Sequence, residues 1–220
     1  MASAKERIPR IIAGLEKAYP EAHCELVYSD PFQLLIATIL SAQCSDRQVN
    51  LVTPDLFKKY PAAADFAEAP PGELETAIRR IGLYRSKAKN IRAACRALVE
   101  KHGGQVPRTM EQLLELNGVG RKTANVVLGN AFGISVGVVV DTHVARLSER
   151  LRLTRYSAPE KIEADLQKLV PPAKWTLFSH LLIWHGRRRC FARNPDCPHC
   201  EILSDCPTGQ KILRKKRSDD

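Results

Sequence analysis

The sequence predicts an all-α fold, and three observations support this. Apolar residues recur at three- and four-residue spacing along most of the 220-residue chain, which is the period of one buried helical face. Capping residues, prolines and glycines divide this pattern into segments of helical length. The run from Ser135 to Val140 alone has the composition of a strand, and a single strand has no partner with which to form a sheet. We therefore expect this run to be a buried extended connection.

The first part of the chain contains a series of predicted helices. The opening helix is amphipathic, with an apolar face formed by Ile8, Ile11, Ile12 and Leu15. The next begins at Asp30, where an N-cap aspartate, a proline at the first helical position and the capping-box residue Gln33 mark a helix start. It continues as the apolar segment from Leu34 to Ala42. A further helix begins at Ser45-Asp46.

The middle of the chain continues in the same way. A short helix from Pro71 to Ile81 ends at Gly82. A longer helix stops at Gly103-Gly104, because glycine readily adopts the left-handed conformation that terminates helices. Thr109 with Gln112 forms a capping box for the helix that follows. The buried face of the long helix is expected to consist of Ala88, Ile91, Cys95, Leu98 and Val99.

The last part contains two further predicted helices and a basic end. Ser157 with Glu160 opens a helix through Leu169, and Pro171-Pro172 breaks the chain before a helix from Trp175 to His185. Basic residues then accumulate at Lys211, Arg214, Lys215, Lys216 and Arg217. We expect residues 211–220 to form a basic flexible tail.

The formal net charge is +10 and the pI is near 9.4. For a chain of this size such a charge implies a polyanionic partner, most simply nucleic acid, although basic residues can also serve solubility alone. No apolar run approaches the length of a membrane span, and the N-terminus lacks the apolar core of a secretory signal. We therefore expect a cytoplasmic protein with no membrane partner.

The segment from Leu116 to Leu128 (LNGVGRKTANVVL) is the central element of the sequence. Two helical patterns flank the very short connection Gly118-Val119-Gly120. Both glycines can adopt a positive φ and leave no side chain above the backbone. The helix start that follows directs unpaired N–H groups outward, where phosphate oxygens bind. These three residues and Arg121 are therefore candidate contacts for the phosphates of a nucleic acid.

Lys122 lies in the first turn of the second of these helices. The helix dipole disfavours a positive charge at this position and so favours the neutral amine that a nucleophile requires. The alternative is that the segment is only a packing device, since glycines are common in turns between helices and a lysine in a first turn is usually solvated.

Asp141 ends an apolar run and begins a predicted helix. Aspartate is a favoured N-cap, so Asp141 could simply accept hydrogen bonds from backbone N–H groups. The functional alternative is a partly buried carboxylate that acts together with a lysine nucleophile.

The seven cysteines form two groups. Three of them, Cys24, Cys44 and Cys95, are scattered at helical positions and are expected to be reduced residues of the core. The other four, Cys190, Cys197, Cys200 and Cys206, have the spacing C-x6-C-x2-C-x5-C. Four thiols so close together in a cytosolic protein indicate a metal site more often than disulfides. The spacing alone leaves zinc and an iron–sulfur cluster open.

Together these segments resemble the endonuclease III family of helix-hairpin-helix DNA glycosylases. The resemblance extends from about Ile11 to Cys206, and its anchors are the hairpin lysine, the VDTH segment with Asp141, the LSAQ segment with Gln43 and the cysteine loop. It implies two helical domains with a DNA-binding groove between them. One is a six-helix domain over residues 24–132 that contains the hairpin. The other is an iron–sulfur cluster domain over residues 1–23 and 133–210.

The resemblance also implies roles for individual residues. Lys122 and Asp141 match the catalytic pair of the family, and the four clustered cysteines match the ligands of its [4Fe–4S] cluster, which replaces zinc as the expected metal. Gln43 and Leu83 match residues that fill the hole left in the DNA by an extruded base. The remaining expected DNA contacts are His143, near the aspartate, and Arg187 and Arg193, near the first cysteine ligand.

The implied function is a base-excision DNA glycosylase with AP lyase activity that removes oxidised pyrimidines from duplex DNA. Lysine attack on C1′ gives a Schiff base, and β-elimination follows. Alternatives are a monofunctional mismatch glycosylase of the same superfamily and a non-catalytic, metal-stabilised DNA-binding module. We expect a monomer, associated with the bacterial nucleoid. Asn117, Cys44 and Ala145 depart from the family pattern, which has proline, alanine and a bulky aromatic residue there.

Overall fold

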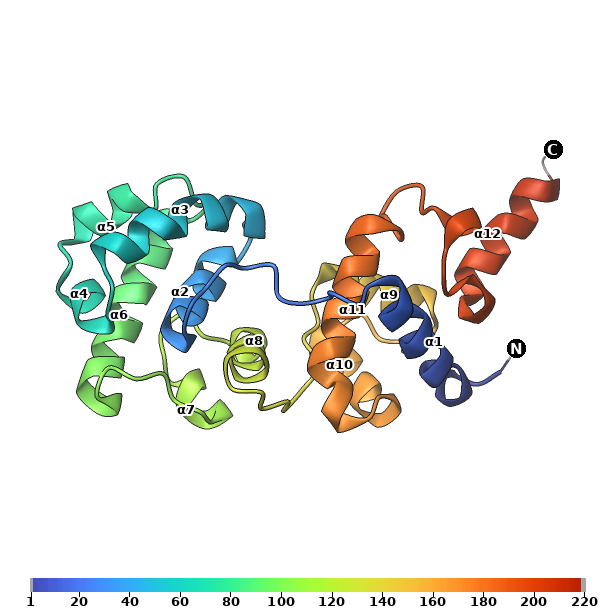
Figure 1. The fold of residues 1–220 in the computed structure, drawn as a ribbon, viewed down its shortest axis with the longest axis horizontal. Coiled ribbons are helices and arrows are strands. Elements are labelled where there is room, and N and C mark those ends of the chain that lie inside the picture. The colour runs from blue at the N-terminus through green and yellow to red at the C-terminus, as the bar shows by residue number, and fades with distance from the viewer. Residues whose placement is uncertain (1, 219–220) are drawn as a thin grey trace. The chain divides into compact units, whose positions relative to one another are not determined.

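The computed structural model describes residues 2–218, and in this range it consists of helices joined by irregular segments, with no strand (Figure 1). The all-α expectation is confirmed. The segment from Ser135 to Val140 is irregular, and Val138 and Val139 within it are buried. Among the described residues no helix is both long and apolar enough to cross a membrane.

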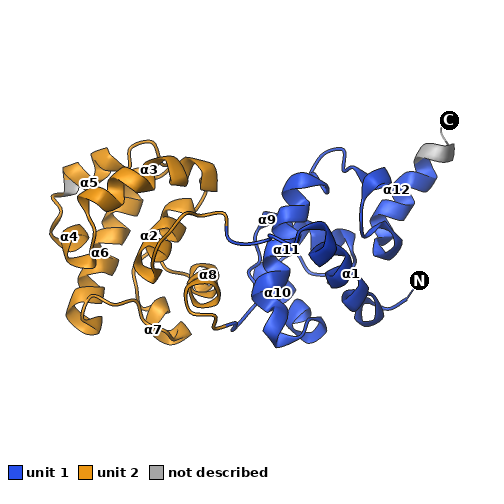
Figure 2. Ribbon diagram, viewed as in Figure 1, with its two compact units in different colours: residues 1–24, 135–220 blue, residues 25–134 orange. Residues whose placement is uncertain are grey.

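The chain divides into two compact units (Figure 2). Unit 1 comprises residues 1–24 and 135–220, and unit 2 comprises Glu25–Ile134. The domains expected from the sequence were 1–23 with 133–210, and 24–132.

Unit 2 is a helical bundle around α2 (Pro31–Ser41). Every residue of α2 from Leu34 to Leu40 is buried, which accounts for a helix that is apolar on all sides. Asp30 caps α2 by accepting a hydrogen bond from the backbone N–H of Gln33 at 2.8 Å. The helices of this unit that follow are α3 (Asp46–Lys59), α4 (Ala63–Glu68), α5 (Pro71–Ala77), α6 (Tyr84–His102), α7 (Met110–Leu114) and α8 (Arg121–Ala131).

Helix α6 is the longest helix of unit 2 and contacts α2, α4 and α5. It ends at Gly103, which has the expected left-handed conformation. Ala88, Ile91, Cys95 and Leu98 are buried as expected, and Lys87 and Ala94 are buried as well, whereas Val99 is 41% exposed. The expectation for Val99 was wrong because it lies beside Leu98 on the helix, and only one of two neighbouring positions faces the core here.

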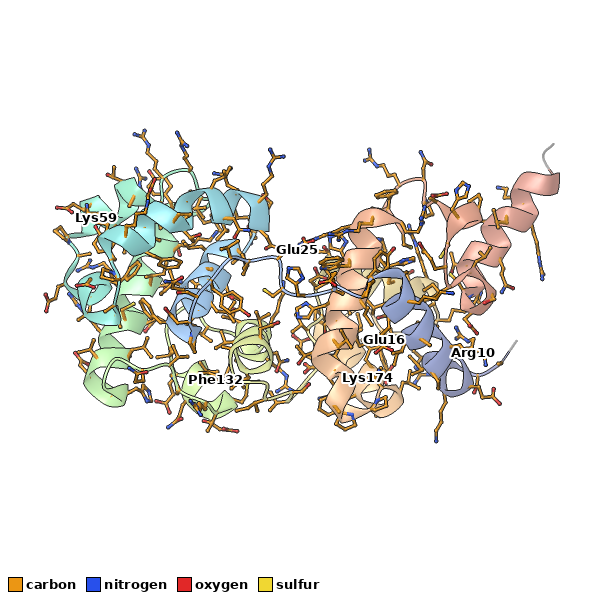
Figure 3. All side chains as sticks on the ribbon, in the orientation of Figure 1. Arg10, Glu16, Glu25, Lys59, Phe132 and Lys174 are labelled. Atoms are coloured by element: carbon orange, nitrogen blue, oxygen red, sulfur yellow. The ribbon has the colours of Figure 1, made fainter. Side chains whose placement is uncertain are left out.

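Unit 1 is built from α1 (Ala4–Ala18), α9 (Thr142–Arg150), α10 (Pro159–Leu169), α11 (Trp175–Arg188) and α12 (Pro207–Ser218), with 3-10 turns at Pro172–Lys174, Cys197–His199 and Leu203–Asp205. The buried guanidinium of Arg7 in α1 donates to the carbonyls of Leu151 and Asp205, at 2.8 and 2.6 Å. Glu16 and Lys174 form an ion pair between α1 and the chain before α11 (Figure 3). These bonds hold the N-terminal helix on the later part of the chain.

Two further details differ from the sequence-based expectations. Helix α10 begins at Pro159 after Ala158, and no side chain caps it, so the expected capping box at Ser157 is wrong. The proline at the first helical position sets this start. Residues 211–218 belong to α12 rather than to a flexible tail, and residues 219 and 220 lie outside the described part. The side chain of Gln210 anchors the first turn of α12 to the carbonyls of Leu203 and Ser204.

Candidate active site and metal centre

The glycine hairpin lies between α7 and α8. Gly118 has a φ of +77°, and a Cβ placed on it would lie 3.0 Å from Cβ of Asn90 in α6. Both the backbone and the close packing on α6 therefore require glycine at this position. Gly120 differs from the expectation, since its φ of −99° is ordinary extended backbone and a Cβ there would meet nothing within 4 Å.

Gly120 is the N-cap residue of α8 and brings no side-chain acceptor to the N–H groups of the first turn. The side chain of Val119 is buried, so only its backbone is available on the surface. Arg121 and Lys122 are exposed. Because Ala124, Val127 and Leu128 are fully buried on the opposite face, α8 presents its positive first turn outward from a firmly packed helix.

Gln43 and Leu83 lie on neighbouring loops of unit 2. Both have left-handed backbone, with φ of +53° and +59°, which costs a residue other than glycine about 1–2 kcal/mol. A Cβ placed on Gly82 would lie 3.6 Å from the carbonyl oxygen of Gln43, so the two loops touch. The side chain of Leu83 is 59% exposed, which excludes a core role for it. Two strained backbones and an exposed leucine at one place indicate a functional surface.

Asp141 is the N-cap residue of α9 in unit 1. Its Oδ1 atom accepts hydrogen bonds from the backbone N–H groups of His143 and Val144, both at 2.8 Å. The carboxylate is half-buried, and Oδ2 accepts no hydrogen bond from the described residues of this unit. The cap therefore fixes the side chain through one oxygen and leaves the other available.

His143 packs tightly between α9 and α11. A Cβ placed on Gly186 would lie 2.8 Å from Nδ1 of His143, so glycine is needed at position 186. Burial lowers the pKa of His143 below its usual value, and the neighbouring cations Arg146 and Arg187 act in the same direction, although Asp141 opposes them. The imidazole is therefore favoured in its neutral form.

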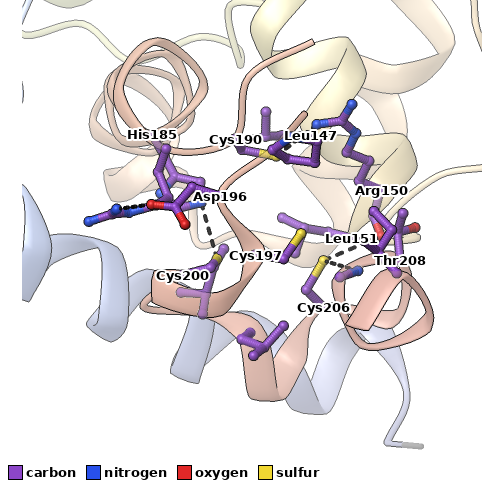
Figure 4. A pocket seen from close by; sticks show the side chains of 16 residues that line it. Leu147, Arg150, Leu151, His185, Cys190, Asp196, Cys197, Cys200, Cys206 and Thr208 are labelled. Carbon is purple, nitrogen blue, oxygen red and sulfur yellow. Dashed lines mark hydrogen bonds and ion pairs between the residues drawn. The ribbon is translucent and has the colours of Figure 1, made fainter. Parts of the chain in front are cut away.

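Four cysteines line one pocket of unit 1, as the sequence spacing predicted (Figure 4). They are Cys190, Cys197, Cys200 and Cys206. All seven cysteines of the chain are free thiols in the described part, so no disulfide competes for them. Burial raises the pKa of Cys200 to about 12 and also raises that of Cys206. The raised pKa values favour the protonated thiols of Cys200 and Cys206, and a bound metal ion displaces such protons and holds the thiolates.

Neighbouring groups already direct hydrogen bonds at these sulfur atoms. Nη1 of Arg150 lies 3.2 Å from Sγ of Cys190, and the backbone N–H of Gly209 lies 3.2 Å from Sγ of Cys206. Donors of this kind stabilise thiolate ligands. The pocket therefore has both the ligand set and the supporting donors of a metal centre.

His185 is a residue that the sequence analysis missed. It is buried, its Nδ1 lies 3.0 Å from the hydroxyl of Tyr19, and its Nε2 lies 3.5 Å from Sγ of Cys200. With Cys200 and Glu201 it forms a second group of potential metal ligands within 4.8 Å of one another. Only its position shortly before Cys190 could have drawn attention to it.

The arginines near Cys190 fall into different environments. Arg189 is paired with Asp196 and Glu201, at 2.5 and 3.2 Å. Arg188 lies over the ring of Trp184, with 3.8 Å between the guanidinium carbon and the ring centroid. Arg193 is exposed and Arg187 is half-buried. Arg193 is therefore accessible to a phosphate.

The chain is similar in sequence and in structure to known DNA-repair proteins. The profile of the family described as HhH-GPD superfamily base excision DNA repair protein matches residues 36–172. Endonuclease III of Synechocystis sp. is 54% identical over 210 residues, which are 96% of each chain. A non-covalent endonuclease III–DNA complex has a TM-score of 0.91 and 46% identity, covering 97% of this chain and 100% of that one. A trapped covalent intermediate of endonuclease III with DNA matches with the same values.

Proposed function

The chain belongs to the HhH-GPD superfamily of base excision DNA repair proteins, and we propose that it is a bifunctional DNA glycosylase and abasic-site lyase that acts on duplex DNA. The observation that carries this function is the 46% identity, over 97% of the chain, to a protein trapped as a covalent intermediate with DNA. A monofunctional glycosylase or a simple binding module forms no such bond, so these alternatives are not favoured.

Lys122 is the proposed nucleophile. It is exposed in the first turn of α8, where its side chain is accessible to a substrate. The lone pair of the amine forms the N–C1′ bond as the glycosidic bond breaks, and the base leaves with the bonding electrons and takes up a proton. A proton moves from the nitrogen to O4′ as the C1′–O4′ bond opens, which gives the protonated Schiff base and a free 4′ hydroxyl group. Loss of the C2′ proton then expels the 3′ phosphate.

Asp141 is the proposed electrostatic partner of this reaction. Cleavage of the glycosidic bond develops positive charge on the sugar, and a fixed carboxylate oxygen stabilises that charge. The two hydrogen bonds to Oδ1 hold the side chain in one orientation, and Oδ2 accepts none from its unit. An amide at this position would keep the shape and lose the charge.

Gln43 and Leu83 are the proposed residues that fill the hole left by the extruded base. Base extrusion costs stacking and pairing energy, and side chains that enter the stack offset part of that cost. Gly118, Val119 and Gly120 with Arg121 are proposed to bind phosphate oxygens through backbone N–H groups and charge. His143, Arg187 and Arg193 are the proposed DNA contacts of unit 1.

Cys190, Cys197, Cys200 and Cys206 are the proposed ligands of a [4Fe–4S] cluster. The all-thiolate donor set and the N–H donors directed at the sulfurs suit such a cluster. When bound, it would supply a rigid cross-link for the segment that carries Arg193. Iron and sulfide analysis with a visible spectrum tests this proposal, and stoichiometric zinc with a colourless protein would overturn it.

The proposed substrates are oxidised pyrimidines and abasic sites in duplex DNA, and the proposed location is the bacterial cytoplasm, in contact with the nucleoid. The proposed active species is a monomer. Ala145, where the family pattern has a bulky aromatic residue, is half-buried two residues after His143.

The decisive experiment is borohydride trapping on duplex DNA with one abasic site. We compare wild-type protein with Lys122→Ala and with Lys89→Ala, which removes an exposed lysine of the same unit. The proposal requires a covalent adduct for wild type and Lys89→Ala, and none for Lys122→Ala. An adduct in all three would move the nucleophile elsewhere, and no adduct in any, with DNA still bound, would overturn the lyase.

A further inference from the structure

Lys87 in α6 is buried, with 4% of its surface exposed, although a lysine is seldom found in a protein interior. Its Nζ atom donates a hydrogen bond to the carbonyl oxygen of Leu40 at 2.8 Å. Its backbone N–H donates to the carbonyl oxygen of Leu83 at 3.0 Å. The second bond is the ordinary first backbone hydrogen bond of α6, made to its N-cap residue Leu83. The side chain of Lys87 therefore reaches the last turn of α2, three residues before Gln43, from a position one helical turn after Leu83.

The bond to Leu40 has a specific local effect. The last carbonyl groups of a helix lack intrahelical partners and carry partial negative charge. The ammonium of Lys87 occupies this position at the end of α2, where the chain leaves the helix at Ala42 and adopts left-handed backbone at Gln43. Lys87 thus stabilises the point at which α2 ends and the Gln43 loop begins.

The charge of Lys87 is poorly compensated. Burial lowers its pKa, and the neighbouring thiol of Cys44 is the one group that opposes this effect. An ammonium has three donors, and the described residues supply one neutral acceptor, the Leu40 carbonyl. An apolar side chain of the same length would avoid this desolvation, so stability alone gives little reason for a cation here.

Helix α6 also connects Lys87 to the hairpin turn at Gly118. Leu83, Lys87 and Asn90 are spaced by four and three residues, so they lie along one stripe of the helix. Asn90 is the residue against which Gly118 packs. One stripe of α6 therefore bonds the end of α2, carries the N-cap residue Leu83 at its start and supports the hairpin turn.

We propose that Lys87 is a positioning residue that holds the Gln43 and Leu83 loops in the relative placement needed to fill the space of an extruded base. This inference rests on the proposed function, because it concerns how that function handles duplex DNA. Lys87 is buried and does not itself touch the substrate. Its effect is expected only where a base stack must be opened.

The test compares Lys87→Met with wild type on two substrates. The first is duplex DNA with one oxidised pyrimidine, and the second is single-stranded DNA with one abasic site, which has no stack to fill. We expect the single-turnover rate on the duplex to fall about tenfold or more, and the rate of borohydride trapping on the single strand to stay within about twofold of wild type. Lys89→Met, an exposed lysine on the same helix, should leave both rates unchanged.

A merely structural role predicts a different pattern. In that case Lys87→Met would lower both rates together, or would lower neither, and the inference would be overturned. The fluorescence of 2-aminopurine next to the lesion gives an independent readout, because it rises when the base stack opens. We expect a smaller rise with Lys87→Met and a normal rise with Lys89→Met.

A double-mutant cycle completes the test. If Lys87 acts through the two loops, Lys87→Met should cause no further loss on the duplex in a Gln43→Ala, Leu83→Ala background. Additive losses would contradict the inference. Lys87→Arg, which keeps the charge, serves as a rescue variant, and Lys87→Gln, which removes the charge, is the substitute if Lys87→Met fails to fold. Failure of the function itself is recognised separately, since wild-type protein would then give no trapped adduct.

Discussion

The Nη2 atom of Arg146 donates to the carbonyl oxygen of Cys190 at 3.0 Å. The same atom lies 3.0 Å from the carbonyl oxygen of Gly186 and 3.1 Å from Nδ1 of His143. Arg146 therefore links α9, which Asp141 caps, to the first cysteine of the proposed metal centre. The carboxylate and the metal segment belong to one hydrogen-bonded assembly within unit 1.

Arg146→Ala should weaken this assembly. The change removes several hydrogen bonds from a half-buried charged group, and we expect a loss of about 2–3 kcal/mol in the free energy of unfolding. Urea denaturation followed by circular dichroism measures it. Arg155→Ala, at an exposed arginine of the same unit, is the control and should change the stability by less than about 0.5 kcal/mol. Equal stability of the two variants would contradict the structural link.

Gly118→Ala and Gly120→Ala form a matched pair in the hairpin. Gly118 has positive φ and touches Asn90, so the alanine variant should lose about 1–2 kcal/mol of stability. Gly120 has extended backbone and open space around it, so its alanine variant should fold with nearly unchanged stability. The melting temperatures of the two variants, measured by thermal unfolding, test this difference in stability.

The same pair tests the role of the hairpin in DNA binding. A methyl group at position 120 would stand where a phosphate approaches the backbone, so we expect Gly120→Ala to weaken duplex binding although it folds normally. Fluorescence anisotropy of a labelled duplex at fixed salt measures this. Unchanged affinity in a stable Gly120→Ala protein would argue against phosphate binding at this turn.

Cys200→Ser should abolish the metal centre. It replaces a proposed soft ligand inside the pocket, and we expect loss of bound metal together with a lower melting temperature. Cys24→Ser changes a half-buried cysteine outside the pocket and should keep the wild-type metal content. Metal analysis by mass spectrometry and calorimetry of the purified proteins are the measurements. Full metal content in Cys200→Ser would remove this residue from the ligand set.

The stability of the protein should depend on His143 in mildly acidic solution. Burial holds the folded-state pKa of His143 below its usual value of 6.5, so the unfolded chain binds the proton more readily. The contribution of His143 to the free energy of unfolding is therefore complete above about pH 6.5. It is lost as the pH falls from there through the lowered folded-state pKa. We measure the free energy of unfolding of wild type and of His143→Asn across this pH range. It should fall more steeply with decreasing pH in wild type than in the variant. Parallel curves would contradict the prediction.

Much of the fold followed from local patterns. Helical periodicity identified the all-α class, and Asp30, Thr109 and Gly103 marked helix ends that the structure contains. The four-cysteine spacing predicted one shared pocket. These signals succeed because they depend on residues within a few positions of one another. Where local signals compete, as Ser157 did with the proline at position 159, the stronger backbone constraint decides.

The sequence by itself determined the helices, the hairpin lysine, the capping aspartate and the cysteine set, since each is written in a short contiguous motif. The tertiary structure alone decided that Leu83 is exposed on left-handed backbone, that Lys87 is buried against the end of α2, and that Arg146 reaches Cys190. These last features arise from contacts between residues that are distant along the chain. Packing selects such contacts only when the helices assemble, and no local pattern contains that information.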